Sequence, residues 1–428
     1  MRQGRLGAKD FRTLGLSALG GALEFFDFVI FVFFTKTLSH LFFPEGMADW
    51  LAQLQVYGIF AAGYLARPLG GVIMAHFGDK DGRKKMFAFS VFLMALPTLL
   101  MGLLPTYAQI GALAPVLLLT LRIVQGIAIG GEVPAAWVFV AEHVPRGRVG
   151  IACASLTSGL TAGILMGSLL ATALHTRMAP EDLLSYGWRI PFLLGGVFGF
   201  LAVWLRKWLS ETPVFEALRA EKAVHQGVPL KEVFAKHRGS VVLSMLVTWL
   251  LTAGILVIIL MTPTLVQGGF GIAAERAFQA NALASLFLCF GCLAGGALVD
   301  AWGAARALAV GAGALLITSL ALYADLAAGA TNFMALSCVA GFCVGVAGVV
   351  PSVMIAAFPP RVRFSGLSFS YNVSYAIFGA LTPPLISYAA SHVGPMAPAY
   401  YVAVASVVGL SIGLYLRTPV ARAKFAKF

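Results

Sequence analysis

Long runs of apolar residues, separated by short polar segments, dominate the pattern of this chain. A helix that crosses a bilayer needs about 20 predominantly apolar residues, and each run supplies enough for one crossing. The runs are continuous rather than alternating, which excludes a transmembrane β-barrel. The pattern therefore predicts an all-α membrane protein with twelve spanning helices, at approximately 14–36, 53–76, 86–104, 111–140, 150–174, 188–208, 240–264, 278–298, 304–324, 333–357, 364–390 and 397–416.

Three of these segments have features of their own. The fourth and the eleventh are longer than one crossing requires, so bending or tilting is expected. The first begins near basic residues, as a signal peptide does, but its apolar run continues past Phe34 and contains Glu24 and Asp27. A signal peptide has a shorter apolar region that ends at a cleavage site. We therefore predict that this segment is the first spanning helix.

Composition agrees with a membrane protein. Of the 428 residues, 59% are hydrophobic and 11% are charged, whereas soluble domains average about 45–50% and about 25%. The five cysteines all lie in apolar segments, where buried free thiols are expected. The seven histidines show no metal-ligand spacing, and the chain lacks the G-x-x-x-x-G-K-[ST] motif. We expect no metal site, no ATP-binding motif and no cofactor other than a coupling proton.

The lysines and arginines are distributed unequally between the two sides of the membrane. On the predicted topology, 24 of the 30 lie on the side that holds both termini, the loops after helices 2 and 4 and the central loop. Loops rich in basic residues stay in the cytoplasm, so both termini are predicted to be cytoplasmic and the number of helices is even. The net charge of +12 therefore reflects topology, and no nucleic-acid partner is expected.

A polar break divides the chain into two sets of six predicted helices, in residues 1–208 and 240–428. The break, residues 209–239, is the longest polar stretch and carries a charged amphipathic run. We expect this linker to form a cytoplasmic helix at the membrane surface.

A sequence repeat relates the two halves. Asp-x-x-Gly follows the second helix at Asp79 and the eighth at Asp300, an offset of 221 residues. Pro-Arg-x-Arg follows the fourth helix at Pro145 and the tenth at Pro360, an offset of 215 residues. Both copies start from the cytoplasm, so the halves are predicted to be parallel repeats. This is a transporter architecture whose substrate site lies between the repeats near the bilayer midplane.

Several motifs resemble those of a known transporter family. Residues 78–85 look like the loop signature of the major facilitator superfamily, and Arg122-x-x-x-Gly126-x-x-x-Gly130 matches its fourth-helix pattern. Four stretches narrow the resemblance to the metabolite:proton symporter family, whose members move citrate, dicarboxylates, shikimate, proline or betaine. These stretches are residues 23–28, 66–70, 125–132, and 358–363 together with 371–372.

The resemblance implies a secondary active transporter with the major facilitator fold, not an enzyme. It also implies a monomer in contact with membrane lipid, located in a bacterial inner membrane. Two positions depart from the family pattern: the basic run after Gly303 is thinned to Arg306, and Ala356 stands where a glutamate is usual. The residues that the resemblance assigns to a cytoplasmic gate are Asp79, Gly82, Arg83, Arg148, Asp300 and Arg363.

Ionisable residues inside the predicted helices are the strongest functional candidates. A charge at bilayer depth costs at least ~2.5–3.5 kcal/mol, so it is retained where it faces a cavity or a partner. Interhelical ion pairs that fix the packing are the alternative explanation. All five such residues lie in the first half: Glu24, Asp27, Arg67, Arg122 and Glu132.

The acidic members of this set point to proton coupling. Glu24 and Asp27 are three residues apart and share a helix face. Two neighbouring buried carboxyl groups favour the binding of a proton. We assign proton coupling to Asp27, with Glu24 and Glu132 as further candidates. A packing or gate role is the alternative for Glu132, which precedes Pro134.

The basic members point to a bound carboxylate. Gly126 and Gly130 share a helix face with Arg122 and leave space beside its guanidinium, which is a bidentate receptor for carboxylates. Arg122 can therefore alternate between Asp27 and a substrate. Arg67 either faces the substrate or pairs with Glu132 or Glu24. Further substrate-binding candidates in the second half are Trp249, Asn281, Tyr371, Asn372 and Tyr375.

Three functional classes fit these residues. Our main prediction is proton-coupled uptake of a small organic anion, such as a di- or tricarboxylate, by alternating access. The alternative is uptake of a zwitterion of the proline or betaine type, in which Arg122 binds the carboxylate. Aromatic residues such as Trp249, Phe26 and Tyr375 then receive the ammonium group. An efflux antiporter is the third class, and a channel or membrane enzyme is disfavoured because no pore-lining repeat or catalytic constellation occurs.

Overall fold

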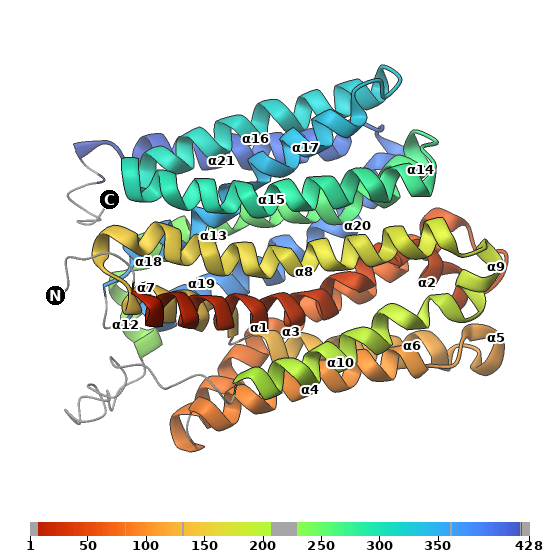
Figure 1. Cartoon of the computed structure of the whole chain (residues 1–428), viewed down its shortest axis with the longest axis horizontal. Helices are drawn as coiled ribbons and strands as arrows, with labels where there is room; N and C mark the ends of the chain where they lie inside the picture. Colours follow the sequence, from red (N-terminus) through yellow and green to blue (C-terminus); the bar gives the residue numbers. More distant parts are fainter. Residues whose placement is uncertain are drawn as a thin grey trace.

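The computed structural model describes residues 7–81, 83–130, 132–206, 229–359, 362–419 and 421. Throughout this part of the chain the regular secondary structure is helical. The helices run roughly parallel in one bundle, and α1 begins and α21 ends at the same end of it (Figure 1). A bilayer enforces such an architecture, because only a helix satisfies all its backbone polar groups within one segment.

Helices of the first half lie together on one side of the bundle (Figure 1). They are α1 (Ala8–Phe33), α2 (Thr35–Phe42), α3 (Asp49–Asp81), α4 (Arg83–Leu103), α5 (Tyr107–Ile110), α6 (Leu113–Ile129), α7 (Glu132–His143), the 3₁₀ turn η1 (Arg146–Arg148), α8 (Val149–Arg177), α9 (Pro180–Asp182), the π-helical η2 (Leu183–Gly187) and α10 (Arg189–Arg206).

Helices of the second half form the other side. They are α13 (Arg238–Ala253), the π-helical η3 (Gly254–Met261), α14 (Thr262–Gly269), α15 (Ala274–Trp302), α16 (Ala304–Ala327), α17 (Phe333–Val344), the 3₁₀ turn η4 (Gly345–Gly348), α18 (Val350–Ala357), α19 (Arg363–Ser374), the π-helical η5 (Tyr375–Gly379), α20 (Ala380–His392) and α21 (Ala397–Tyr415). Of the predicted linker helix, the structure describes α12 (Pro229–Lys236).

The described helices occupy the places of all twelve predicted segments. Eight helical stretches are long and apolar enough to span a bilayer, and a ninth is formed by Pro180–Gly187 and Arg189–Trp204, which meet at a 42° bend. The remaining three are α3, α4 and the pair α6 and α7. The predicted all-α fold with twelve spanning helices is therefore confirmed.

Several predicted segments differ from the observed helices in their continuity. The fourth segment, predicted at 111–140, is divided between α6 and α7 at Gly130. A Cβ on Gly130 would lie 2.2 Å from the carbonyl oxygen of Arg67, so the break occurs where the backbone of α3 packs directly against this segment. The eleventh segment, predicted at 364–390, contains the π-helical turn that begins at Tyr375. Such turns are frequent at functional sites.

Glycines allow α3 and α6 to pack with their backbones in contact. A Cβ on Gly126 would lie 1.9 Å from the carbonyl oxygen of Gly63, and a Cβ on Gly70 would lie 1.9 Å from that of Ile127. Small residues at such positions let membrane helices approach closely and gain van der Waals contact. This packing brings the side chains of α3 and α6 to one place inside the first half.

The two halves meet along α8 and α15, which lie side by side in Figure 1. Ser158 donates a hydrogen bond to the carbonyl oxygen of Cys289 (3.1 Å), and Asn281 donates one to Ser168 Oγ (3.0 Å). A second seam joins α3 to α19, η5 and α20. The candidate site lies at this second seam.

Candidate transport site between the two halves

Arg67 lies on α3 at the seam between the halves, immediately before Pro68. Its side chain is fully buried. Its guanidinium carbon lies 4.5 Å from the ring centre of Tyr375, 5.0 Å from that of Tyr64, 5.5 Å from that of Phe28 and 5.8 Å from that of Tyr371. None of its three side-chain nitrogens has a hydrogen-bond partner among the described residues.

Both halves contribute to this aromatic cage, which we define as Phe28, Tyr64, Tyr371 and Tyr375. Phe28 lies on α1 and Tyr64 on α3, one helical turn before Arg67. Tyr371 lies on α19, and Tyr375 begins the π-helical turn η5. The rings contact one another across the seam, with centroids 5.2 Å apart for Tyr64 and Tyr375 and 4.6 Å apart for Tyr371 and Tyr375.

Arg122 is the second buried cation and lies on α6. Its guanidinium carbon lies 3.8 Å from the ring centre of Phe28, 4.6 Å from that of Phe60 and 4.8 Å from that of Phe31. Nη2 donates to the backbone oxygen of Phe28 (3.2 Å), and Nη1 donates to Gln125 Oε1 (2.9 Å). Both arginines therefore contact the ring of Phe28, and no described ion pair neutralises either one.

Asp27 lies on α1 next to Phe28 and is 1% exposed. Neither carboxyl oxygen has a hydrogen-bond partner among the described residues. The carboxyl group lies against α10: a Cβ on Gly195 would lie 2.7 Å from Oδ1, and one on Gly199 would lie 2.9 Å from Oδ2. These two glycines leave the space that the carboxyl group occupies.

A polar chain leads from Arg122 towards Asp27. Gln125 accepts a hydrogen bond from Arg122 and donates one through Nε2 to Thr98 Oγ1 (2.5 Å). Thr98 is a neighbour of Asp27, because the Cβ position of Gly195 is 2.9 Å from Thr98 Cγ2 and 2.7 Å from Asp27 Oδ1. In this conformation Arg122 is thus linked to the vicinity of Asp27 through two neutral side chains. The direct ion pair between Arg122 and Asp27 that the sequence suggested is absent from the described ion pairs.

Asn372 connects the second half to the break in the fourth segment. Its side-chain amide donates to the backbone oxygen of Gly130 and to that of Ser368 (3.0 Å). Oδ1 has no partner among the residues that the structure describes. Asn372 therefore lies beside the site, close to the break between α6 and α7.

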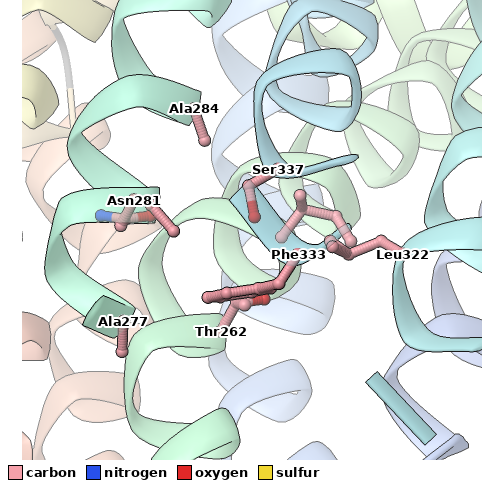
Figure 2. Close-up of a pocket in the computed structure, with 9 residues that line it drawn as sticks. Thr262, Ala277, Asn281, Ala284, Leu322, Phe333 and Ser337 are labelled. Carbon is pink, nitrogen blue, oxygen red and sulfur yellow. The ribbon is translucent and has the colours of Figure 1, made fainter. Parts of the chain in front are cut away.

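Two other predicted substrate residues have different surroundings. Trp249 stacks on Phe378, with centroids 4.8 Å apart, and donates to Tyr401 Oη (2.8 Å). Asn281 bridges the halves near a small cavity with room for about one water molecule, and Figure 2 shows it on the wall opposite Ser337. Phe26, the remaining predicted ammonium receptor, packs against Phe198 at 5.2 Å. Of the predicted aromatic receptors, Tyr375 alone belongs to the cage.

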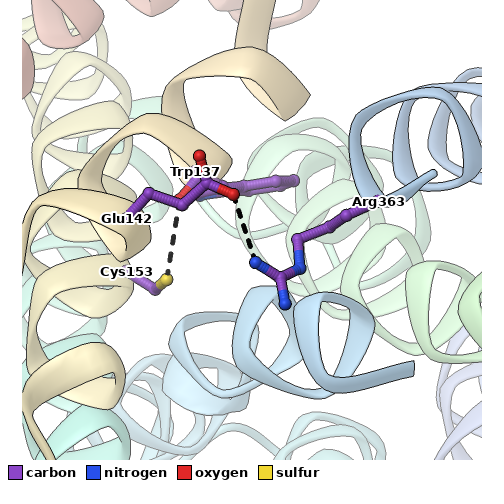
Figure 3. A network of polar contacts seen from close by, with 4 residues as sticks. All are labelled: Trp137, Glu142, Cys153 and Arg363. Carbon is purple, nitrogen blue, oxygen red and sulfur yellow. Dashed lines mark hydrogen bonds and ion pairs between the residues drawn. The ribbon is translucent and has the colours of Figure 1, made fainter. Parts of the chain in front are cut away.

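The predicted cytoplasmic gate is described in part. Arg363 at the start of α19 pairs with Glu142 of α7 at 3.2 Å, across the two halves (Figure 3). Asp300 accepts hydrogen bonds from the backbone nitrogens of Gly150 (2.7 Å) and Ile151 (3.1 Å) at the start of α8. A carboxylate at a helix N-terminus satisfies free N–H groups and is attracted by the helix dipole.

The remaining predicted gate and coupling residues are Arg148, Gly82, Glu24, Glu132, Asp79 and Arg83. Arg148 ends η1 with an exposed side chain. Gly82 lies outside the described residues, and so do the side chains of Glu24, Glu132, Asp79 and Arg83.

Comparison with known proteins now identifies the family. Residues 17–324 match the family described as Major Facilitator Superfamily. A relative from Staphylococcus aureus (strain COL), described as a putative proline/betaine transporter, is 30% identical over 409 residues, which cover 95% of this chain and 88% of the relative. The chain belongs to the Major Facilitator Superfamily.

Further relatives of this transporter have related descriptions. The proline/betaine transporter of Salmonella typhimurium (strain LT2) is 29% identical, and so is that of Escherichia coli (strain K12); each match covers 95% of this chain and 83% of the relative. The fold resembles the xylose transporter XylE of E. coli in a partially occluded inward-open conformation. That likeness has a TM-score of 0.74 at 16% identity and covers 96% of this chain and 97% of XylE. The protein is thus a multi-pass membrane transporter, not an enzyme.

Sequence reasoning missed several residues of the site in this transporter. Phe28, Gln125 and Tyr64 complete the surroundings of the two arginines. Tyr64 precedes Arg67 by three residues and so shares its helix face, which is the signal that could have revealed it. Thr98 and Glu142 gave no local signal, because each acts through a helix that is distant in sequence.

Proposed function

We propose that this transporter carries a small zwitterion of the proline or betaine type into the cell together with a proton. The observation that carries the proposal is the pairing of buried guanidinium groups with aromatic rings at the seam between the halves. A zwitterion needs both kinds of group: a cation for its carboxylate and π-faces for its ammonium. The descriptions of the relatives support the same substrate class.

The carboxylate is assigned to Arg122. A buried charge without a partner costs several kcal/mol, and Arg122 is held here by neutral oxygens of Phe28 and Gln125. A carboxylate that replaces the Gln125 oxygen gives the guanidinium a charged partner, which makes a hydrogen bond roughly twice as strong as a neutral one. The fully buried setting increases that gain.

Proton coupling is assigned to Asp27. An ionised carboxyl group with no hydrogen bond is unfavourable in a buried pocket, so Asp27 is expected to carry a proton in this conformation. The route of communication is the chain from Arg122 through Gln125 to Thr98. When a substrate binds the guanidinium of Arg122, Gln125 loses that hydrogen-bond donor and its amide is held by Thr98 alone. The environment of Asp27 then depends on whether substrate is bound.

Uptake of an organic anion is the second candidate. Two buried guanidinium groups that contact one ring and lack a described acidic partner suit a substrate with two carboxylates. The aromatic cage argues against this candidate, because the negative π-face of a ring repels a carboxylate. Relatives described as proline/betaine transporters also favour the zwitterion.

An uptake experiment separates the two candidates. Purified transporter in liposomes is tested with labelled proline, glycine betaine, succinate and citrate, with and without an imposed inward proton gradient. We expect proline or betaine to accumulate when the gradient is present and to equilibrate when an ionophore collapses it. Accumulation of succinate or citrate alone would overturn the proposal and establish the anion transporter. Gradient-driven loss of preloaded substrate would establish an antiporter.

The topology can be tested independently. We place both termini and the 209–239 linker in the cytoplasm because of the asymmetry of the basic residues. A reporter that is active only in the cytoplasm should be active when fused after Lys427 and inactive when fused to a chain truncated at Gly271, between α14 and α15. The opposite pair of results would reverse the orientation.

A further inference from the structure

The aromatic cage around Arg67 is poorly matched to the group that occupies it. A guanidinium has five N–H donors, yet none of its nitrogens has a hydrogen-bond partner among the described residues, and the side chain is fully buried. A buried donor without an acceptor is unfavourable. The four rings offer π-faces at 4.5–5.8 Å from the guanidinium carbon. They satisfy the positive charge of Arg67 but leave its donors unsatisfied.

A quaternary or fully substituted ammonium group is the better match. It carries the same charge but has no N–H donors or few, so rings alone satisfy it, as in the aromatic cages that bind choline or methylated lysine. The cage lies next to Arg122, because Phe28 contacts both guanidinium groups. A ligand whose ammonium group lies in the cage is therefore close to Arg122, which contacts the same ring and can bind the carboxylate of the ligand.

We propose that the cage formed by Phe28, Tyr64, Tyr371 and Tyr375 is the receptor for the substrate ammonium group, and that Arg67 is an internal occupant which the substrate displaces. This inference rests on the proposed zwitterion transport. On displacement, the Arg67 guanidinium leaves the rings and pairs with the substrate carboxylate, which Arg122 also binds. Arg67 thus gives up cation–π contacts and gains charge-assisted hydrogen bonds.

Displacement of Arg67 predicts that the transporter discriminates against simple cations. A ligand such as choline has an ammonium group but no carboxylate, so it offers Arg67 no new partner and leaves two cations competing for one set of rings. A zwitterion brings the anion that draws Arg67 away. The position of Arg67 is therefore enough to favour a ligand that carries both an ammonium group and a carboxylate.

The cage also connects binding to the closure of the two halves. Phe28 and Tyr64 belong to the first half, whereas Tyr371 and Tyr375 belong to the second. The cage is complete only when these helices meet, as they do in this conformation. An ammonium group in the cage therefore favours the closed seam and is released when the seam opens.

The test measures equilibrium binding of glycine betaine and choline to the purified transporter. In the unmodified protein we expect betaine to bind and choline to bind at least about tenfold more weakly, since one lost charge contact of this kind is enough for that factor. Arg67→Gln empties the cage: choline affinity should rise about tenfold or more, while betaine affinity should fall. Adding Tyr375→Leu to Arg67→Gln should abolish this increase in choline affinity. Arg306→Gln, a matched change of an exposed arginine, should alter neither affinity.

The outcomes separate this inference from the proposed function. If the unmodified protein binds no zwitterion but Arg67→Gln binds choline, the cage stands and the substrate class is wrong. If the unmodified protein binds betaine while Arg67→Gln gains no choline binding, the internal occupant is refuted and the substrate class stands. If Arg67→Gln does not fold, two variants of Tyr375 test the cage instead. Tyr375→Phe should keep betaine affinity, and Tyr375→Leu should lower betaine affinity about tenfold. Equal affinities for these two variants would overturn the cage.

Discussion

Replacement of Arg122 by alanine is expected to abolish binding of the carboxylate-bearing substrate. The guanidinium is fully buried, and no described acid competes for it. Removal of one partner of a buried, hydrogen-bonded charge pair costs about 2–5 kcal/mol, or more. Arg122→Lys should restore a part of the affinity only, because an ammonium group lacks the planar fork that holds a carboxylate through two bonds. Equilibrium binding of labelled substrate to purified variants measures both effects.

Control variants distinguish a lost contact from a damaged fold. Arg306→Ala removes an exposed arginine and should leave substrate affinity unchanged. Arg122→Ala also removes the hydrogen bonds to Phe28 and Gln125, so each variant is first compared for thermal unfolding and for elution as a single species. A folded Arg122→Ala protein that binds substrate with unchanged affinity would make Arg122 a packing residue and would remove the main support for a bound carboxylate.

Replacement of Asp27 by asparagine is expected to uncouple the transporter. Asparagine has the size of aspartic acid and resembles its protonated form, so it fits the pocket beside Gly195 and Gly199. The variant should therefore lose accumulation driven by a proton gradient, because no proton binds or leaves at this position. It should keep exchange of substrate between two compartments at equal concentration, which needs no net proton movement. Both assays use the same liposomes.

Asp325→Asn is the matched control. Asp325, near the end of α16, accepts hydrogen bonds from Thr331 and Asn332 in the loop that follows, so the same chemical change there should affect neither assay. Continued accumulation by Asp27→Asn in response to an imposed proton gradient would move the coupling site elsewhere. Glu24 and Glu132 would be tested next, and then coupling to another ion.

Local sequence was sufficient for the fold and for the list of buried charges. The apolar runs became helices, some of them interrupted or bent as at Gly130, because a bilayer leaves a chain no other way to satisfy its backbone. Asp27, Arg67 and Arg122 stood out as charges inside apolar runs, and all three are at most 1% exposed in the structure. The expense of burying a charge makes such residues visible without any knowledge of their neighbours.

Tertiary packing alone decided what surrounds these charges. Sequence pattern offered Trp249 and Phe26 as ammonium receptors, but Trp249 stacks on Phe378 and Phe26 packs on Phe198. Neighbouring positions on a helix point about 100° apart, so the orientation of each helix in the bundle decides which ring faces the site. The same applies to Asp27, whose neighbours come from α4 and α10. Sequence thus determined which charges are buried, whereas the approach of distant helices determined their partners.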